Sequence, residues 1–474
     1  MVGVTRIAIV GGGPGGYEAA LVAVQLGAEV CVVDRDGLGG SAVLTDCVPS
    51  KTLVATAEVM SLTAESAELG VRLGGADPPG IEGITPDSEQ VAADLARVNA
   101  RVKRLARAQS ADITARLNRE GVRVLRGTGR LDGPQRVVAA LADGGEETLE
   151  ADAILVSTGA HPRELPDALP DGERILTWTQ LYELDHLPST LIVVGSGVTG
   201  AEFASAYTAL GADVVLVSSR ERVLPGEDAD AAQVLEDVFA RRGMTVLSKS
   251  RAQSVKRVGD EVLVALEDGR TVEGSHCLMA VGSIPNTADL GLAEAGVRLD
   301  KGGFIEVDRV SRTAARGVYA AGDCTGVLML ASVAAMQGRI AMWHALGDAV
   351  TPLDLKSVSS NVFTDPEIAT VGYTRAALDR EGIPHTSVKL PLATNARAKM
   401  QGFSDGFVKL FARSGTGMVV GGVVVAPRAS ELIFPLALAV DLNLTVDQVA
   451  HTFTIYPSLT GSIAEAARQL HPRG

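Results

Sequence analysis

The sequence predicts an α/β fold in which two similar domains with parallel sheets precede a C-terminal α+β domain with an antiparallel sheet. Three observations lead to this fold class. A glycine-rich strand–turn–helix pattern opens the chain, a second copy begins near residue 191, and shorter strand-like segments mixed with helices follow residue 351. At 474 residues the chain is also too long for one hydrophobic core, which favours about three domains.

Composition and charge limit the class of protein. Apolar residues make up 46% and charged residues 21%, which is typical of a globular protein and not of a disordered one. The net charge of −14 argues against a nucleic-acid partner, whose phosphates need a basic surface, and weakly against docking on an anionic membrane. We expect no membrane span, because no apolar run reaches the roughly 18 residues that a crossing helix needs.

The cysteines and the N-terminus indicate the compartment. The four cysteines are Cys31, Cys47, Cys277 and Cys324, and they show neither metal-ligand spacing nor the density of a disulfide framework. The N-terminus runs directly into a strand pattern, without a basic and then apolar signal segment. We therefore expect a cytoplasmic protein with no metal site.

The first glycine-rich pattern lies in residues 6–36. A buried strand over residues 7–10 leads into a GxGxxG turn, a helix to about Gln25 and a second strand that ends at Asp34. The first glycine allows the tight turn, the second lets a pyrophosphate approach the helix N-terminus, and the third permits close helix–strand packing, while the acid binds a ribose hydroxyl. This pattern predicts a Rossmann-like dinucleotide-binding domain. The three glycines are Gly11, Gly13 and Gly16.

The second copy occupies residues 191–217, with Gly195, Gly197 and Gly200 in the same spacing. A buried strand again precedes the turn and a helix follows it. Two such patterns in one chain predict two bound dinucleotides.

The remaining elements follow from periodicity. Apolar positions such as Val91, Leu95 and Val98 recur every three to four residues and predict a long helix over 86–121, preceded by a surface loop over 74–86. Strands that end at turns are expected in three further α/β segments and two C-terminal segments, namely 154–166, 272–286, 317–326, 407–414 and 418–426.

These motifs, in this order, resemble the flavoprotein disulfide reductase family, which includes dihydrolipoyl dehydrogenase, glutathione reductase and mercuric reductase. The likeness covers essentially the whole chain. It rests on Gly11–Gly16 with Asp34, Ser157–Gly159, Gly195–Gly200, Gly282–Asn286, Ala320–Asp323 and Phe363–Ala369. The resemblance implies noncovalent FAD, NAD(P)H on one flavin face, a substrate site on the other, and a homodimer in which the partner's C-terminal domain completes each site.

The resemblance also implies domain boundaries and binding residues. FAD is expected to bind a domain made of residues 1–158 and 283–350, NAD(P)H a domain over 159–282, and the partner subunit a dimerisation domain over 351–474. The residues expected at FAD are Gly11, Gly13, Pro14, Gly15, Gly16, Asp34, Gly40, Ser41, Cys47, Lys51, Gly129, Thr158, Gly159, Asp323 on the ribityl chain, Leu330 and Ala331. Those expected at NAD(P)H are Gly195, Gly197, Val198, Thr199, Gly200, Glu202, Ser218, Arg220, Arg222 and Gly282.

The redox segment of the family is incomplete in this chain. Family members carry Cys-x4-Cys followed by an apolar residue and Pro-Ser-Lys. Here Cys47 and the residues 48–51 match, but Ala42 stands five positions before Cys47. The sulfur that would attack a substrate disulfide is therefore missing, and no thiolate is available there for thiol–disulfide exchange.

The matching base is also missing near the C-terminus. The family places His-Pro-Thr-x-x-Glu there, whereas this chain has Tyr456 in place of the His and Gly461 in place of the Glu. His451 lies close in sequence, but its helical context favours a structural or surface role. Loss of thiol, base and orienting acid, with both dinucleotide motifs kept, predicts a changed reaction.

A path for reducing the flavin is retained. The resemblance implies that Lys51 lies beside the flavin and pairs with Glu202, which would stabilise negative charge on the reduced flavin. Cys47 could tune the flavin or be an inert thiol, and both interpretations stay open. Ser218 stands where many NAD-preferring members carry an acid, and Arg220 or Arg222 could pair with a 2′-phosphate or be solvated loop charges. We expect NADPH to be preferred and NADH to be tolerated.

The sequence thus predicts an FAD-dependent NAD(P)H dehydrogenase that reduces a quinone-type acceptor, like the NAD(P)H quinone reductases of the family that lack the disulfide. Tyr456, supplied by the partner subunit, could hydrogen-bond a quinone oxygen or be merely structural. Two alternatives remain: a pyridine nucleotide transhydrogenase, and a non-catalytic flavoprotein sensor or adaptor. The retained lysine–glutamate pair and second nucleotide motif argue against the sensor.

Overall fold

The computed structural model describes residues 4–66, 69–71 and 91–471. The chain divides into two compact units, and the helices α3 (Cys47–Glu65) and α4 (Leu95–Arg119) contribute residues to both. The first unit combines Met1–Thr52, Ala100–Arg163 and Gly282–Asp354, and the second combines Leu53–Asn99, Glu164–Val281 and Leu355–Gly474. The loop expected over 74–86 lies outside the described residues.

The first unit contains a seven-stranded sheet in the order β17-β6-β1-β2-β3-β4-β5. The strands β17, β6, β1, β2 and β3 are parallel, and β3, β4 and β5 form an antiparallel meander. Their bounds are β1 Arg6–Val10, β2 Glu29–Asp34, β3 Arg123–Leu131, β4 Arg136–Leu141, β5 Glu146–Glu150, β6 Ala153–Val156 and β17 Val318–Ala320. A two-stranded ribbon of β7 (Ala160–Pro162) and β16 (Ser283–Pro285) belongs to the same unit.

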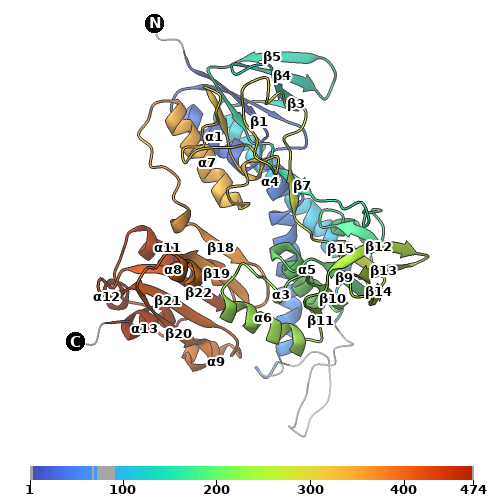
Figure 1. The fold of residues 1–474 in the computed structure, drawn as a ribbon, viewed down its shortest axis with the longest axis vertical. Coiled ribbons are helices and arrows are strands. Elements are labelled where there is room, and N and C mark those ends of the chain that lie inside the picture. The colour runs from blue at the N-terminus through green and yellow to red at the C-terminus, as the bar shows by residue number, and fades with distance from the viewer. Residues whose placement is uncertain (1–3, 67–68, 72–90, 472–474) are drawn as a thin grey trace. The chain divides into compact units, whose positions relative to one another are not determined.

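Both faces of the sheet are buried around the parallel strands β1 and β6, as expected for parallel strands. Successive side chains of a strand point to opposite faces, so Ile7 and Ile9 of β1 join one hydrophobic core while Ala8 and Val10 join the other. The helices α1 (Pro14–Gln25) and α7 (Ala331–Ala345) lie side by side (Figure 1). They approach closely because Gly338 of α7 packs against the Gly15 backbone, where a Cβ would overlap the Gly15 carbonyl oxygen.

The second unit begins with a five-stranded parallel sheet in the order β11-β10-β9-β15-β8. Its bounds are β8 Ile175–Thr177, β9 Thr190–Val194, β10 Asp213–Val217, β11 Thr245–Leu247 and β15 His276–Met279, with helices α5 Val198–Leu210 and α6 Ala229–Arg241. An antiparallel sheet of β12 (Ala252–Val258), β13 (Glu261–Leu266) and β14 (Thr271–Gly274) follows α6. The two parallel sheets confirm the two predicted α/β parts.

The C-terminal part of the second unit is an antiparallel sheet in the order β18-β19-β22-β21-β20. Its strands are β18 Ser359–Val362, β19 Glu367–Gly372, β20 His385–Pro391, β21 Phe407–Arg413 and β22 Val419–Ala426. Its helices are α8 Arg375–Arg380, α9 Ala396–Met400, α10 Ala429–Leu432, α11 Phe434–Asp441, α12 Val446–His451 and α13 Gly461–Gln469. The predicted α+β architecture with an antiparallel sheet is confirmed.

Helix α4 begins later than its apolar spacing predicts. Residues 91–94 are not helical, and Asp94 accepts the Arg97 backbone N–H with a side-chain oxygen at 3.0 Å, as an N-cap does. At the other end Gly121 has a φ of +83°, which stops the helix. Periodicity alone therefore placed the start too early, because the cap decides it.

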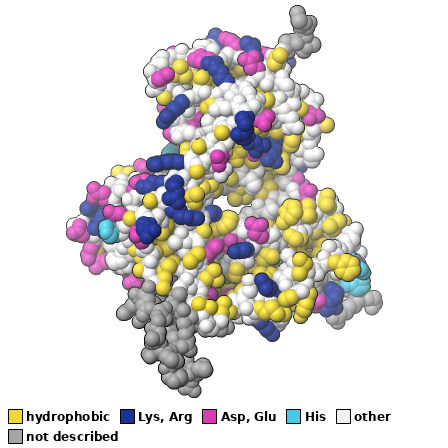
Figure 2. Space-filling view, turned by 180° about the vertical axis from the view of Figure 1, so that it is seen from behind, with side chains coloured by type: hydrophobic (Ala, Val, Ile, Leu, Met, Phe, Trp, Pro, Cys, Tyr) yellow, Lys and Arg dark blue, Asp and Glu magenta, His cyan; other side chains and the backbone are white. Residues whose placement is uncertain are grey.

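Charge is unevenly distributed over the surface despite the net value of −14. Figure 2 shows dark-blue basic side chains in several groups on the face drawn there, with magenta acidic side chains between them. Four exposed arginines in the first half of α4 follow one another at spacings of three or four residues, namely Arg97, Arg101, Arg104 and Arg107. Within the described ranges, no helix combines the length and apolar character needed to cross a membrane.

Candidate functional site

The first glycine turn, between β1 and α1, has the geometry of a dinucleotide cradle. Gly11 has a φ of +98°, and a Cβ there would overlap the Ser157 carbonyl oxygen. A Cβ on Gly16 would overlap the Gly11 carbonyl oxygen. Gly13, by contrast, has no atom within 4 Å of the place a Cβ would take, so this turn is open where a pyrophosphate would approach the N-terminus of α1.

Asp34, the last residue of β2, faces this turn. Its Oδ2 accepts the Gly12 N–H at 2.7 Å, and its Oδ1 accepts the N–H groups of Asp36 at 3.0 Å and Gly37 at 2.6 Å. A carboxylate offers about four acceptor sites, so one remains for a ribose hydroxyl. The structure thus brings the predicted acid and the glycine turn together.

The second glycine turn, between β9 and α5, repeats the same three roles. Gly195 has a φ of +115°, and a Cβ there would overlap the Ala280 carbonyl oxygen. A Cβ on Gly200 would overlap the Gly195 carbonyl oxygen, whereas Gly197 faces open space. Val198 and Thr199 open α5 immediately after the turn. The residues present therefore fit one dinucleotide at each turn.

The residues that we expect near the 2′-phosphate of NADPH follow the end of β10. Ser218 is fully buried, and its hydroxyl lies 2.6 Å from the Ser196 hydroxyl and accepts the Arg220 backbone N–H at 3.1 Å. The exposed Arg220 forms no side-chain hydrogen bond or ion pair with any residue that the structure describes. Arg222 donates to the Ala229 carbonyl at 3.1 Å. Of the two arginines predicted here, Arg220 is thus the one whose guanidinium is uncommitted among the described residues.

Other predicted FAD residues lie around the first turn. Thr158 donates its hydroxyl to the Asn286 carbonyl at 2.6 Å, and the Asn286 amide donates to the Thr158 carbonyl at 2.9 Å. The Asn286 backbone N–H donates to the Gly159 carbonyl at 2.9 Å. Asn286 therefore fixes the segment after β6, a role that sequence reasoning missed although it quoted the motif containing this residue.

The segment that follows β2 also approaches the first glycine turn. Gly40 begins the short helix α2 (Gly40–Leu44), and a Cβ on it would lie 2.8 Å from the Gly13 Cα atom. Ser41 follows it on an exposed position. Gly129 lies on β3, where a Cβ would meet the Val10 side chain at 3.1 Å. Gly282, predicted to contact NAD(P)H, belongs to the first unit and has a φ of +95°.

Asp323 follows β17, near the start of α7, where Leu330 is the N-cap and Ala331 the first residue. Burial, and then the neighbouring Asp46 carboxylate, raise the pKa of Asp323 to about 6. Gly322 before it has a φ of +83° and donates its N–H to the Gln337 side chain at 2.8 Å. A largely buried carboxyl group held at this strand end fits a partner for the ribityl hydroxyls of FAD.

The sulfur atoms of the chain offer no disulfide. All four cysteines are free thiols. Ala42 lies in α2, and Cys47 is the first residue of α3. Cys324, the one thiol next to Asp323, is fully buried, donates to the Ala321 carbonyl at 3.3 Å, and has its pKa raised to about 11 by burial. It therefore cannot replace the missing nucleophile at neutral pH.

The predicted charged pair is divided between the units. Lys51 lies on α3 in the first unit, and Glu202 lies on α5 in the second. Glu202 is 4% exposed, and its Oε1 accepts the Phe363 N–H at 2.9 Å. Their pairing stays a prediction.

The C-terminal segment that replaces the family's base is strongly exposed. Tyr456 is 86% exposed, and Phe453 and Ile455 beside it are 103% and 81% exposed. His451 is the last residue of α12, and its Nδ1 lies 2.7 Å from the Asp447 carbonyl. A run of exposed large apolar side chains is typical of a surface that a partner covers.

Comparisons with known proteins agree with this geometry. A family model described as pyridine nucleotide-disulphide oxidoreductase matches residues 5–338, and its dimerisation domain matches residues 358–467, which supports a homodimer. Over 98% of this chain and 94% of the relative, the sequence is 55% identical to an NAD(P)H dehydrogenase (quinone) of Mycobacterium tuberculosis. It is 34% identical to a dihydrolipoyl dehydrogenase of Chlorobaculum parvum, over 97% of this chain and 96% of that one.

Solved structures match along the whole length. The crystal structure of LpdA from Mycobacterium tuberculosis superposes with a TM-score of 0.92 at 55% identity and covers 99% of this chain and 100% of that one. The flavoprotein disulfide reductase RclA from Escherichia coli gives a TM-score of 0.84 at 22% identity, over 98% and 99% of the chains, and shows a shared fold. The chain belongs to the pyridine nucleotide-disulphide oxidoreductase family and is an oxidoreductase that uses FAD and NAD(P)H.

Proposed function

We propose that this protein is an NAD(P)H:quinone oxidoreductase, which passes electrons from NADPH or NADH through FAD to a quinone-type acceptor without thiol–disulfide chemistry. The observation that carries the proposal is Ala42, which stands where a second redox sulfur would be needed to pair with Cys47. The relative at 55% identity that is named NAD(P)H dehydrogenase (quinone) supports the same acceptor class.

Quinones suit an enzyme that lacks a reactive thiol. A quinone is planar and takes up two electrons without a bond to sulfur. The reduced nicotinamide supplies a hydride, and one further proton from solvent completes the conversion of quinone to hydroquinone. FAD, when bound, would supply the hydride acceptor and the electron carrier, so the protein's own part is to bind, orient and adjust charge.

Each group of residues has its own role in this proposal. The two glycine turns bind the pyrophosphates, and Asp34 and Asp323 hold sugar and ribityl hydroxyls of FAD. Lys51, paired with Glu202, places a positive charge beside the flavin and favours its reduced form. The hydrogen bond from Phe363 fixes the Glu202 carboxylate in orientation.

The acceptor site in this proposal lies where the dimerisation domain of the partner subunit meets the flavin. Tyr456 then contributes a hydroxyl to a quinone oxygen, and its exposure in the single chain is consistent with a residue that acts in a dimer. Cys47 packs near the flavin as a residue that adjusts its electronics or as an inert thiol. The proposal assigns residues 1–158 and 283–350 to FAD, 159–282 to NAD(P)H and 351–474 to the dimer, in the cytoplasm.

NADPH is the preferred donor in this proposal. Ser218 is uncharged at the end of β10, where many NAD-preferring members carry an acid that would repel the 2′-phosphate. Arg220 offers an uncommitted guanidinium to that phosphate. Because Arg222 already donates to the Ala229 carbonyl, its contribution is smaller. NADH, which lacks the phosphate, still binds through the glycine turn.

The test is NADPH oxidation by the purified, FAD-loaded protein with a soluble naphthoquinone, run beside lipoamide, oxidised glutathione and NAD⁺. We expect turnover with the quinone and none with either disulfide. Turnover with lipoamide would show that another thiol substitutes and would overturn the proposal. Faster hydride transfer to NAD⁺ than to the quinone would identify a transhydrogenase, and bound FAD that no acceptor reoxidises would identify a sensor or adaptor.

A further inference from the structure

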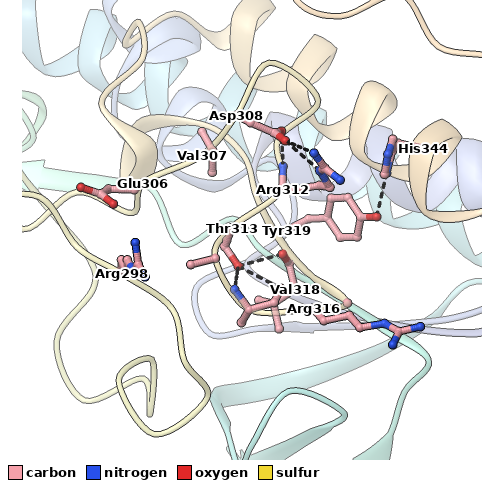
Figure 3. A pocket seen from close by; sticks show the side chains of 13 residues that line it. Arg298, Glu306, Val307, Asp308, Arg312, Thr313, Arg316, Val318, Tyr319 and His344 are labelled. Carbon is pink, nitrogen blue, oxygen red and sulfur yellow. Dashed lines mark hydrogen bonds and ion pairs between the residues drawn. The ribbon is translucent and has the colours of Figure 1, made fainter.

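A pocket of about 610 Å³ lies in the first unit, away from the predicted FAD residues (Figure 3). Its lining includes Val318, the first residue of β17, and Arg316 just before that strand, whereas Asp323 follows the end of the strand. Gly11 and Asp34 likewise lie at the carboxyl ends of strands parallel to β17. The pocket therefore lies at the amino ends of the parallel strands, whereas the dinucleotide turn lies at their carboxyl ends. Its volume is that of a small-molecule site.

Basic side chains dominate the pocket wall. Three arginines and two carboxylates line it, namely Arg298, Arg312, Arg316, Glu306 and Asp308. The Asp308 carboxylate is committed to Arg312, whose Nε and Nη2 both lie 2.7 Å from Oδ2. Arg298 and Arg316 form no ion pair with any described residue, and Figure 3 shows them on two sides of the pocket. Two guanidinium groups thus keep their donors for a ligand.

The loop that presents Arg312 and Arg316 is braced by its own hydrogen bonds. Asp308 Oδ1 accepts the N–H groups of Val310 and Arg312, each at 3.0 Å. The Thr313 hydroxyl donates to the Val318 carbonyl at 2.9 Å and accepts the Ala315 N–H at 3.1 Å. A loop fixed in this way loses little entropy when a ligand binds.

A hydrogen-bonded ring pair closes one side of the pocket. The Tyr319 hydroxyl lies 2.9 Å from Nδ1 of His344, and Tyr319 is 6% exposed. Burial raises the pKa of Tyr319, so the phenol keeps its proton and stays an uncharged hydrogen-bond partner of Nδ1. Nε2 of His344 forms no hydrogen bond with any residue that the structure describes, so this ring nitrogen stays available to a ligand.

We propose that this pocket binds a small organic oxyanion, a carboxylate or a phosphate ester, through the guanidinium groups of Arg298 and Arg316, with His344 on the same pocket wall. The volume leaves room for an organic body as well as the charged groups. This inference does not depend on the acceptor of the redox reaction, because the pocket lies at the opposite ends of the strands from the dinucleotide turn.

The experiment is isothermal titration calorimetry of the FAD-loaded protein at constant ionic strength, with tricarballylate as the carboxylate probe and pyrophosphate as the phosphate probe. We expect at least one probe to bind, and the double variant Arg298→Gln, Arg316→Gln to weaken that binding by about tenfold or more. Binding of tricarballylate alone would assign a polycarboxylate, and binding of pyrophosphate alone a phosphate ester.

The control is Arg101→Gln, which removes an exposed arginine of α4 outside the pocket and should leave the affinity unchanged. Pyrophosphate held at the Gly195–Gly200 turn would persist in the double variant, so the comparison isolates the pocket. FAD content reports whether each variant is folded. Absence of heat with both probes, or equal affinity in the double variant and the parent, would overturn the proposal.

Discussion

The hydroxyls of Ser196 and Ser218 lie 2.6 Å apart, and both side chains are buried. Ser196 belongs to the second glycine turn and Ser218 follows β10, so this hydrogen bond joins the pyrophosphate end of the site to the ribose end. The Ser218 hydroxyl also accepts the Arg220 N–H at 3.1 Å, which sets the direction in which Arg220 leaves the sheet.

Ser218→Ala should destabilise the fold by about 1 to 3 kcal/mol, because it leaves the Ser196 hydroxyl and the Arg220 N–H without a buried partner. Urea denaturation measures the loss. Ser219→Ala, on the exposed neighbour, is the matched control and should stay within about 0.5 kcal/mol of the parent. Equal stability of both variants would show that the hydroxyl pair contributes nothing.

Arg220→Gln should raise KM for NADPH about tenfold and leave KM for NADH unchanged, since only NADPH carries the phosphate that the guanidinium would meet. Steady-state kinetics with the same quinone measure both. Arg222→Gln should change KM for NADPH less, because Arg222 already donates to the Ala229 carbonyl. Parallel changes for both nucleotides would remove Arg220 from the specificity argument.

Alanine variants of two glycines in the second turn should affect nucleotide binding and protein stability differently. Gly197→Ala has open space for its Cβ, so we expect normal thermal stability but an NADPH KM raised about tenfold, because the methyl group occupies the place of the pyrophosphate. Gly200→Ala should instead lose about 2 kcal/mol or more of stability, because its Cβ overlaps the Gly195 carbonyl oxygen. Unchanged nucleotide binding in Gly197→Ala would place the cofactor elsewhere.

Cys47→Ser should retain quinone reduction within about threefold, because the proposed reaction forms no bond to sulfur. Turnover measured before and after iodoacetamide treatment of the parent protein gives an independent check, and both should agree. A loss of about 100-fold or more with retained FAD would make the thiol part of the chemistry.

Asp323 should give the flavin-free chain a pH-dependent stability. Its folded pKa of about 6 lies above its ordinary value of 3.8, so the folded state binds the proton more tightly than the unfolded state does. Protonated Asp323 therefore stabilises the fold at low pH, and this stabilisation is lost as pH rises through 6. Asp323→Asn should therefore stabilise the flavin-free protein relative to the parent by up to about 3 kcal/mol at pH 7, with little difference at pH 4. Urea denaturation at the two pH values measures this, and a constant difference between them would contradict the buried-carboxyl interpretation.

Local features of the fold were predictable because short stretches of chain determine them. Each GxGxxG turn satisfies its steric demands within a few residues, and the strands and α1 follow from simple periodicity. The start of α4 was not predictable from spacing, because the cap at Asp94 decides where it begins. The meander of β3, β4 and β5 was also missed, since no glycine motif marks it.

The sequence by itself determined the family, the two dinucleotide turns and the absence of a second redox sulfur at Ala42, because identity and spacing along the chain are enough for these. Only the tertiary structure decided that Gly13 and Gly197 face open space while Gly16 and Gly200 are packed against carbonyl oxygens. It also decided that Ser218 is buried against Ser196, and that arginines from separate segments line one pocket together with Tyr319 and His344. These relationships join residues far apart in the chain, so burial and packing determine them and no local pattern does.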